Sequence, residues 1–585
     1  MSKRMLLVLL AVLLILVCSC AGALLGAGVL WMARQTPVAT QVVPAETPSA
    51  ETPSSATPSS SPVPESTPAG GNKEGKLTPR PSQPQVQGGG TLRLWGSLPP
   101  TLDPAMVQDT TSSFYVTHLF SGLVRLTADL EIVPDLASEW SLENDGLTYV
   151  FRLNPEATFA DGSPLTAEHV RRSWERACSP ALDSPVALAY LQDIVGAGEY
   201  ARGQADRIVG LEVRDAHTLA VTIDSYKSYF LAKLTYPTAL VVDVDQAEAD
   251  PDGWMLDPNV SGPFQLQSVT QSQIVFSRNP RYHGSPPQLE RVEIVLDGGL
   301  PITMYENDRL DIVDVWADEL DRVTDPYNPL HTELHVASEL SVDYLAMDVT
   351  RPPFDDPLVR QAIFFAIDRE KLASLVLNNT ALPARGIVPP ALVQAEADAA
   401  AALMVYDPDK ARRLLQESRY SQPGAMPEVV LSISGTSGYL PEETEAVLAM
   451  LEENLGLVVT VEQIDWPDFL QDLNSRRYAF YASGWMADYP DQQNFLDLLF
   501  HSDSPQNHVG YSNAEVDRLL EQARVELNAV ERARLYGQAE LLILQDAPWV
   551  PLTHGEAYTL VKPRVGGYRS SASLYPWLLD VYLQE

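Results

Sequence analysis

Strand and helix patterns alternate along the chain from about residue 90 onward. Residues 91–95 (TLRLW) alternate between apolar and polar positions, as in a half-buried strand. Residues 140–153 are typical of a hairpin with Asn144-Asp145-Gly146 as its turn. Shorter apolar runs predict further strands at 219–223, 274–277, 429–433 and 458–461, the last two buried. The pattern therefore predicts an α/β protein with mixed sheets in more than one lobe.

Helices are expected where a capping residue stands just before an apolar face. Asp356-Pro357 and Asp407-Pro408 each place a cap and a first-turn proline ahead of such a face. Gly456 is the expected end of a helix that begins at Pro441. The remaining start signals are Thr166 and the Ser512/Glu515 capping box.

The head of the chain predicts a membrane attachment. Lys3 and Arg4 precede an uncharged, mostly apolar stretch from Met5 to Met32, which is nearer the ~20 residues of a membrane span than the ~7–15 of a signal core. Cys20, in a lipobox-like Val-Cys-Ser-Cys, offers the alternative of a lipoprotein signal. The apolar run continues past Cys20, which favours an uncleaved anchor. Either alternative for residues 1–35 tethers the body to the outer face of the cytoplasmic membrane.

Residues 36–87 are rich in Pro, Ser, Thr, Glu and Gln and contain almost no large apolar residue. Such a segment buries too little surface to offset the entropy lost on ordering. We expect a disordered, semi-extended stalk.

Charge and motif content exclude several classes of function. The chain has 40 basic and 77 acidic residues, a net charge of -37, which opposes binding of nucleic acid. The body has one cysteine, Cys178, so no internal disulfide is expected. No H-E-x-x-H, G-x-S-x-G, phosphate-loop or Rossmann motif is found, and His331 and His335 have no evident third metal ligand. We therefore expect no enzyme activity, cofactor or metal.

Residues 483–500 (SGWMADYPDQQNFLDLLF) hold the best candidate site. Trp485, Asp488 and Tyr489 place an aromatic wall beside a fixed negative charge. That combination suits a ligand with an apolar body and a cationic end. The alternative is a surface turn with a core tryptophan, because aromatic residues are more often core than site.

Motifs along nearly all of 90–585 resemble the extracytoplasmic solute-binding proteins of peptide and nickel ABC importers, the oligopeptide/dipeptide-binding (family 5) type. The matching blocks are TLDPA at 101–105, residues 134–170, SGPF at 261–264, NPRY at 279–282, 344–372, 406–415, the stretch around Asp488, and 510–551. Two positions depart from the family pattern. Gln492 follows Asp491 where the family often has proline, and Asp348 replaces a usual asparagine.

The resemblance implies a periplasmic-binding-protein-like type II fold, with two lobes and a ligand cleft between them. Lobe I is expected at 88–126, 233–335 and 545–585, with an extra subdomain at 127–232. Lobe II is expected at 336–544. In the family the lobes close on an extended peptide, whose main chain pairs like an added strand and whose side chains enter roomy, hydrated pockets.

The resemblance also implies which residues bind. Asp488, in the family's W-x-x-D motif, is expected to hold a peptide's amino terminus, with Trp485 and Tyr489 beside it. The ligand-pairing strand is expected at Gln108, Asp109, Thr110, Thr111 and Ser112. The expected partners are a short peptide, ABC permease subunits with their ATPases, and the membrane, with the protein a monomer. The alternatives are a non-peptide solute such as an oligosaccharide or metal complex, or a signalling co-receptor on the same scaffold.

Overall fold

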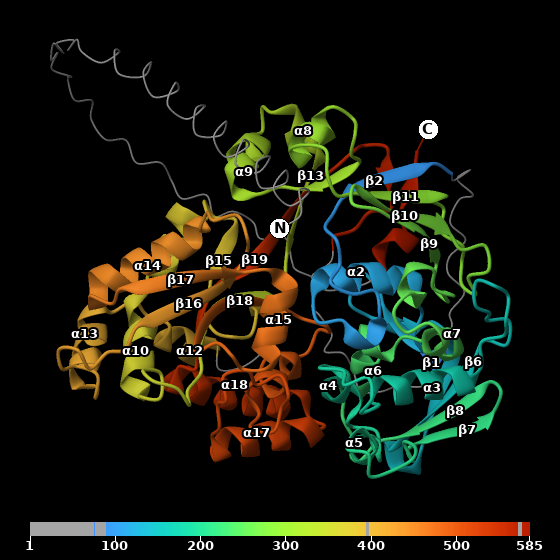
Figure 1. Ribbon diagram of the computed structural model, residues 1–585, viewed down its shortest axis with the longest axis horizontal. Coiled ribbons are helices and arrows are strands. Elements are labelled where there is room, and N and C mark those ends of the chain that lie inside the picture. The colour runs from blue at the N-terminus through green and yellow to red at the C-terminus, as the bar shows by residue number, and fades with distance from the viewer. Residues whose placement is uncertain (1–74, 77–88, 393–396, 571–575, 585) are drawn as a thin grey trace, which may run out of the picture. The chain divides into compact units, whose positions relative to one another are not determined.

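One long strand, β19 (Trp549–Val561), belongs to both lobes of the protein (Figure 1). Its first half pairs with β14 (Ser341–Met347), and its second half pairs with β12 (Ile312–Asp314) and β13 (Leu334–Ser338). The computed structural model describes residues 75–76, 89–392, 397–570 and 576–584. Within them β19 joins the two lobes in a single twelve-stranded sheet. The predicted boundary at residue 545 therefore assigns to lobe I a strand whose first half pairs within lobe II.

The sheet of lobe I is mixed. β2 runs parallel to β11 and β12, while β10 is antiparallel to its neighbours β9 and β11. The alternating pattern of residues 91–95 is confirmed as β2, whose side chains are alternately buried and half-buried. The other bounds in lobe I are β9 (Phe264–Val269), β10 (Gln273–Arg278), β11 (Arg291–Val295), β20 (Val565–Gly566), β21 (Tyr582–Leu583), α2 (Thr110–Leu119), α7 (Val244–Ala249), α8 (Pro301–Glu306) and α9 (Ala317–Thr324).

The subdomain carries a separate five-stranded sheet in the order β1-β5-β6-β8-β7. The predicted hairpin is confirmed as β5 and β6, with the turn at Asn144–Gly146. Thr166 caps α3 in a capping box with His169. The bounds are β1 (Gly75–Lys76), β3 (Val124–Leu126), β4 (Ile132–Pro134), β5 (Ala137–Glu143), β6 (Thr148–Leu153), β7 (Leu211–Asp215), β8 (Thr218–Thr222), α3 (Ala167–Ala177), α4 (Ala187–Leu191), α5 (Ala197–Ala201) and α6 (Phe230–Lys233).

Strand β1 corrects part of the stalk prediction. Gly75 and Lys76 pair with Trp140 and Glu139 of β5. For these two residues the expectation of disorder is wrong, because the open edge of β5 offers backbone groups that any sequence can pair with. The rest of the predicted stalk, the predicted anchor and Cys20 lie outside the described residues. In the part of the chain that the structure describes, no helix is both long and apolar enough to cross a membrane.

In lobe II the strands follow the order β17-β16-β18-β14, and helix α14 packs against β17 while helix α15 packs against β16 (Figure 1). Asp356 and Asp407 cap α10 and α13 as predicted, and Gly456 ends α14 with φ 65°. The cap of α17 is Asn513 and not the predicted Ser512, because the Asn513 amide oxygen accepts the hydrogen bonds from the first turn. The bounds are β14, β15 (Ala381–Pro383), β16 (Val429–Ser434), β17 (Val459–Ile464), β18 (Phe480–Met486), α10 (Pro357–Ala366), α11 (Arg369–Lys371), α12 (Ala397–Leu403), α13 (Pro408–Glu417), α14 (Glu442–Leu455), α15 (Trp466–Asn474), α16 (Asp497–Phe500), α17 (Ala514–Val525) and α18 (Ala529–Asp546).

One predicted strand differs in burial. Residues 458–461 were expected to form a buried strand, but β17 lies at the edge of the sheet and none of its side chains is fully buried. Val458, just before it, is 69% exposed. A short apolar run can therefore mark an edge strand as well as a central one.

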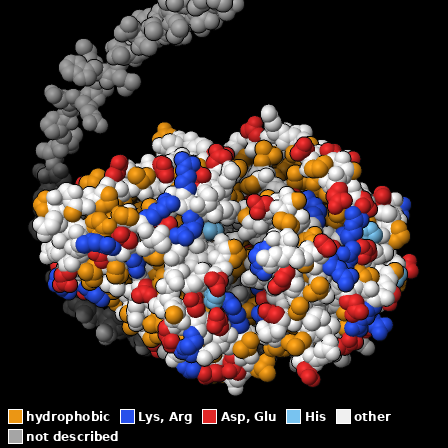
Figure 2. Space-filling model, turned by 60° about the horizontal axis from the view of Figure 1, so that its bottom comes forward, with side chains coloured by type: hydrophobic (Ala, Val, Ile, Leu, Met, Phe, Trp, Pro, Cys, Tyr) orange, Lys and Arg blue, Asp and Glu red, His pale blue; other side chains and the backbone are white. Residues whose placement is uncertain are grey.

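The buried apolar side chains show where the parts of the fold meet. Those of the lobe I sheet form a cluster of their own. Those of the subdomain and lobe II form one continuous cluster together with some residues of lobe I, and in it Tyr190 and Tyr236 join Tyr344 and Trp549. On the face drawn in Figure 2, basic and acidic side chains are interspersed. The net negative charge is therefore not gathered into one field on that face.

Candidate ligand-binding cleft

The carboxylate of Asp488 is buried against the subdomain. Asp488 follows directly after β18 and is 8% exposed. The hydroxyl of Tyr190, on α4, donates to Asp488 Oδ2 at 2.5 Å, and the amide of Asn494 donates to the same oxygen at 2.9 Å. Burial raises the pKa of Asp488 to about 6, and the two hydrogen bonds oppose this rise. The carboxylate is therefore charged at neutral pH but poorly solvated.

Asn494 fixes the position of both motif residues. Its Oδ1 accepts the indole N–H of Trp485 at 3.0 Å and the backbone N–H of Asp488 at 3.1 Å. Asn494 is fully buried in the short helix at Gln492–Asn494. The side-chain amide of Asn494, six residues after Asp488, therefore connects the end of β18 to the following turn and fixes both residues of the W-x-x-D motif.

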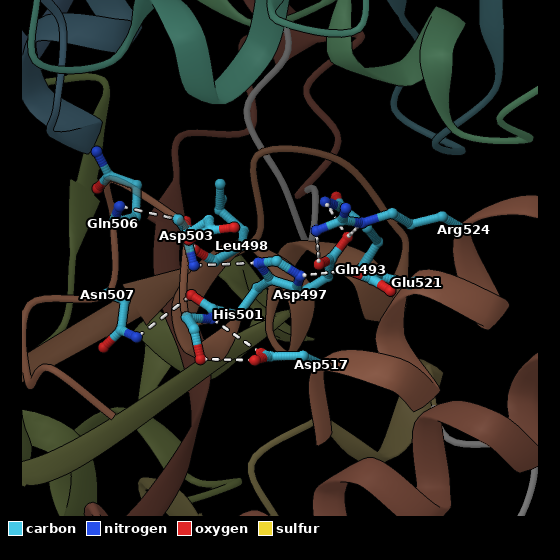
Figure 3. Close-up of polar contacts among 12 residues, drawn as sticks. Gln493, Asp497, Leu498, His501, Asp503, Gln506, Asn507, Asp517, Glu521 and Arg524 are labelled. Atoms are coloured by element: carbon cyan, nitrogen blue, oxygen red, sulfur yellow. Dashed lines mark hydrogen bonds and ion pairs between the residues drawn. The ribbon is translucent and has the colours of Figure 1, made fainter. Parts of the chain in front are cut away.

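Asp488 has no cationic partner within ion-pair distance among the described residues. Two other acids of the same stretch are paired with arginines. Asp491 binds Arg532 through two hydrogen bonds of 2.6 and 3.0 Å, and Asp497 binds Arg524 at 2.7 and 2.8 Å. Figure 3 shows the Asp497–Arg524 pair, with Gln493 on the same carboxylate. Burying a charge without an opposite partner is costly, so Asp488 differs in kind from its neighbours.

The departure at Asp348 has a local explanation. Asp348 is 1% exposed, and both of its carboxylate oxygens accept hydrogen bonds from Arg476, at 2.9 and 3.1 Å. Arg476 compensates this negative charge inside lobe II. The aspartate at position 348 therefore adds no uncompensated charge to the cleft.

A cavity of about 60 Å³ lies beside Asp488, between lobe II and the facing side made by lobe I and its subdomain. Six aromatic side chains line it: Tyr190, Tyr236, Tyr344, Trp466, Trp485 and Trp549. Two of the contacts among them are parallel stacks, Tyr190 on Tyr236 with ring centroids 3.7 Å apart and Tyr344 on Trp549 at 3.4 Å. These stacks give the cavity flat, stiff walls from both sides of the cleft.

Among the described residues, polar contacts and a cation–π contact cross the cleft near the cavity. Besides the Tyr190–Asp488 bond, Asn474 donates to Gln108 Oε1 at 2.6 Å, and Gln506 donates to the carbonyl of Pro185 at 3.1 Å. The guanidinium of Arg532 lies 5.5 Å from the ring centroid of Tyr229. The structure is therefore in a closed arrangement, held partly by bonds between the protein's own side chains.

Some of the predicted site residues line the cavity and others do not. Trp485 and Gln108 line the cavity, and Asp488 reaches it through Tyr190. Tyr489 does not line it: this side chain is fully buried, and its hydroxyl donates to Gln493 at 2.5 Å. We assign Tyr489 to packing behind the site.

The prediction of a pairing strand at 108–112 is wrong for its second half. Asp109 caps α2, its Oδ1 accepting the N–H of Ser112 at 2.8 Å, so Thr110, Thr111 and Ser112 form the first helical turn. Ser112 is fully buried. The backbone is extended at Asp109, whose other oxygen, Oδ2, is buried without a hydrogen-bond partner among the described residues.

Several lining residues had no signal in the sequence. Tyr190 and Asp488 are 298 positions apart, and no spacing rule connects them. Gln506 and His508 follow the motif closely but lie in an irregular segment whose direction only the fold decides. The helical start at Asp109 could have been found, because Asp is a preferred cap.

Comparison with known proteins places this geometry in a family. Residues 131–507 match the family model described as "Bacterial extracellular solute-binding proteins, family 5 Middle". The Escherichia coli (strain K12) "Probable deoxycholate-binding periplasmic protein YgiS" is 31% identical over 482 residues, 80% of this chain and 89% of that protein. The "Dipeptide-binding protein DppE" of Bacillus subtilis is 27% identical, over 78% of this chain and 84% of that protein. A solved oligopeptide-binding protein of Borrelia burgdorferi, OppAIV, is 27% identical with a TM-score of 0.77, over 84% of this chain and all of that one.

Proposed function

Because the chain belongs to the bacterial extracellular solute-binding proteins of family 5, we propose that it captures short peptides between its lobes and delivers them to an ABC importer. Membership of this family establishes the type II two-lobed fold and an extracytoplasmic solute-binding role. The peptide ligand and the residues that hold it are our proposal.

The uncompensated carboxylate of Asp488 is the observation that carries this proposal. A peptide's terminal ammonium would supply the positive charge that the described residues do not place beside this acid. Such a pair, covered by closed lobes, is weakly screened by solvent and salt. Recognition of the ammonium is independent of the peptide's sequence.

Closure is proposed to couple binding to transport. Tyr190 comes from the subdomain and Asp488 from lobe II, so a ligand bound at this point contacts both sides of the cleft. The β13–β14 connection and β19 join the lobes and are the segments that would bend. A permease that binds only the closed form would then select the loaded protein.

A bile acid is the second candidate ligand. The relative named as deoxycholate-binding is 31% identical, and the stacked aromatic walls offer flat apolar surfaces for a ring system. The cavity lining includes no lysine or arginine to meet a bile acid's carboxylate, and Asp488 would repel that group. The electrostatics therefore favour the peptide.

Membrane attachment by residues 1–35, with residues 36–87 as a stalk, remains part of the proposal. A tether would keep the receptor at a high local concentration near its permease. Cys20→Ala separates the two forms of attachment: loss from the membrane fraction would indicate a lipid anchor, and retention a spanning segment.

We also propose the predicted bounds of the lobes and the subdomain, except that the chain passes from lobe II to lobe I within β19. We further propose that the protein is a monomer, which light scattering would test.

The ligand class is tested by what the protein carries. Protein purified without refolding is denatured, and the released small molecules are identified by mass spectrometry. We expect peptides of a few residues, and calorimetric titration with those peptides should reproduce the binding. Recovery of a steroid acid or a sugar, with no peptide binding in titration, would overturn the proposal.

A further inference from the structure

The cavity next to Asp488 is small and largely apolar. Its volume is about 60 Å³, about four to six times the minimum that holds one water molecule. Four aliphatic side chains complete the aromatic lining: Val186, Leu470, Leu473 and Leu499. An apolar group of about four heavy atoms would match this space, counting one atom for each water position.

The polar residues of the lining are all neutral. They are Gln108, Ser483, Gln506 and His508. Burial, with a smaller contribution from Arg476, lowers the pKa of His508 to about 4, so its imidazole is uncharged near neutral pH. None of the fifteen residues that line the cavity is Asp, Glu, Lys or Arg. A charged side chain placed here would find no ion-pair partner in the lining.

Two of these polar groups are already engaged across the cleft. Gln108 accepts from Asn474, and Gln506 donates to Pro185. His508 Nε2 is buried without a hydrogen-bond partner among the described residues. The lining therefore offers a ligand a neutral hydrogen-bonding atom at His508 but no charged group, so an ionised side chain would lie there without an opposite charge.

Tyr190 connects the cavity with the ammonium site. Its ring lines the cavity while its hydroxyl donates to Asp488. A peptide whose ammonium meets Asp488 would therefore place a side chain close to its amino end at this cavity. Side chains farther along the peptide would lie beyond it.

We propose, building on the peptide-binding function above, that this cavity selects peptides by one apolar, leucine-sized side chain near the amino terminus and rejects charged side chains there. This differs from the roomy, hydrated pockets that the family resemblance implies. The lobes close over a lining that offers neither charge nor space for a hydrated ion. A buried charge without a partner carries a penalty that a buried leucine does not.

A series of tripeptides tests the selection on the unaltered protein. The peptides carry Leu, Ala, Trp, Lys or Glu at the first or the second position, with glycine elsewhere, and are titrated at pH 7.5. At one of the two positions we expect Leu to bind most tightly and Lys and Glu to bind about thirtyfold more weakly or worse. Trp is expected to bind less tightly than Leu because its ring exceeds the cavity.

A variant sharpens the test. Gln108→Glu keeps an oxygen that accepts the hydrogen bond from Asn474 but places a negative charge in the lining. We expect it to shift the Lys/Leu affinity ratio toward Lys by about tenfold, the scale of one weakened ion pair. Gln204→Glu, the same change on an exposed surface residue of the subdomain, should leave the ratio unchanged.

The outcomes distinguish failure of the proposed side-chain selection from failure of the proposed peptide binding. If the peptides bind but Lys, Glu and Leu differ by less than threefold at both positions, the cavity does not select and this inference is wrong, while peptide binding stands. If no peptide of the series binds, the proposed function is wrong and the inference falls with it. A Gln108→Glu protein that has lost its fold, judged by its melting temperature, leaves the peptide series on the unaltered protein to decide.

Discussion

The stretch from Asp488 to Asp497 contains three acidic residues in two different settings. Asp491 and Asp497 each receive two hydrogen bonds from an arginine, Arg532 on α18 and Arg524 on α17. Among the residues that the structure describes, Asp488 receives hydrogen bonds from neutral donors alone, Tyr190 and Asn494. The paired acids attach helices α17 and α18 to the back of the site. The unpaired acid lies at the cleft, where a ligand can supply the missing charge.

Replacing the unpaired acid should have the largest effect on binding. Asp488→Asn keeps the shape of the side chain but leaves a bound ammonium without its counter-charge. We expect an affinity loss of about 2–5 kcal/mol, or roughly 30- to 4000-fold, by calorimetry. The melting temperature should stay the same or rise, because a buried charge is removed.

A matched variant shows whether this loss is specific to the cleft. Asp355 also accepts a hydrogen bond from a tyrosine hydroxyl, that of Tyr420, but within lobe II. Asp355→Asn should bind peptide as the wild type does. An Asp488→Asn protein with unchanged affinity would remove Asp488 from the site.

Replacing a paired acid should lower the stability of the protein but change its peptide affinity little. Asp497→Asn leaves the partly buried Arg524 without its carboxylate. We expect a loss of about 3 kcal/mol in the free energy of unfolding, the low end for breaking a buried pair, since Arg524 keeps some contact with solvent. Peptide affinity, measured well below the melting temperature, should change little. A large affinity loss without destabilisation would erase the distinction between the two kinds of acid.

Removing the hydroxyl that crosses the cleft should have a smaller effect. Tyr190→Phe keeps the ring stacked on Tyr236 but deletes the hydrogen bond to Asp488. We expect an affinity loss of about 1.5–3 kcal/mol, the value of a hydrogen bond to a charged group. Tyr420→Phe, which deletes the bond to Asp355, is the matched control. Equal effects of the two changes on affinity would show that the Tyr190 hydroxyl has no special role in closure.

The smallest expected effect is a dependence on pH. Burial raises the pKa of Asp488 to about 6, and only the charged form pairs with an ammonium. Affinity should therefore be highest near pH 7 and fall by about tenfold between pH 7 and pH 5. It should also fall above about pH 8, where the peptide's own ammonium loses its proton. His508, with a pKa of about 4, stays neutral through this window. A wild-type protein as insensitive to pH as Asp488→Asn would contradict the assignment.

The raised pKa of Asp488 has the opposite effect on the folding stability of the ligand-free protein. A carboxyl whose pKa rises from 3.8 to about 6 on folding favours the folded state at pH below 3.8, and that contribution is lost as the pH rises through about 6. Stability and affinity should thus change in opposite directions with pH. Asp488→Asn should remove both dependences.

The sequence predicted most of the local structure and half of the site. Caps at Asp356 and Asp407, the hairpin turn at Asn144–Gly146 and the helix end at Gly456 are local signals, and the structure confirms each of them. Asp488 and Trp485 could be proposed because they lie in one short motif. Their role as ligand contacts stays a prediction until a complex is measured.

The other half of the site depends on how distant segments pack. Tyr190 meets Asp488 only because the subdomain closes against lobe II, and Trp466 and Trp549 arrive from a helix and from the crossing strand. None of these contacts follows from spacing along the chain. The family resemblance predicts a strand after Gln108, whereas the local signal of Asp109 as a helix cap predicts the helix that the structure has there.

The central claim is that Asp488 pairs with the ligand's ammonium, and a double-mutant cycle tests it most directly. A peptide that co-purifies with the protein is compared with its N-acetylated form, which lacks the positive charge, on wild type and on Asp488→Asn. The two changes should not be additive: acetylation should weaken binding to the wild type by roughly 30-fold or more and change binding to Asp488→Asn little. Equal losses on both proteins would show that the ammonium is held elsewhere.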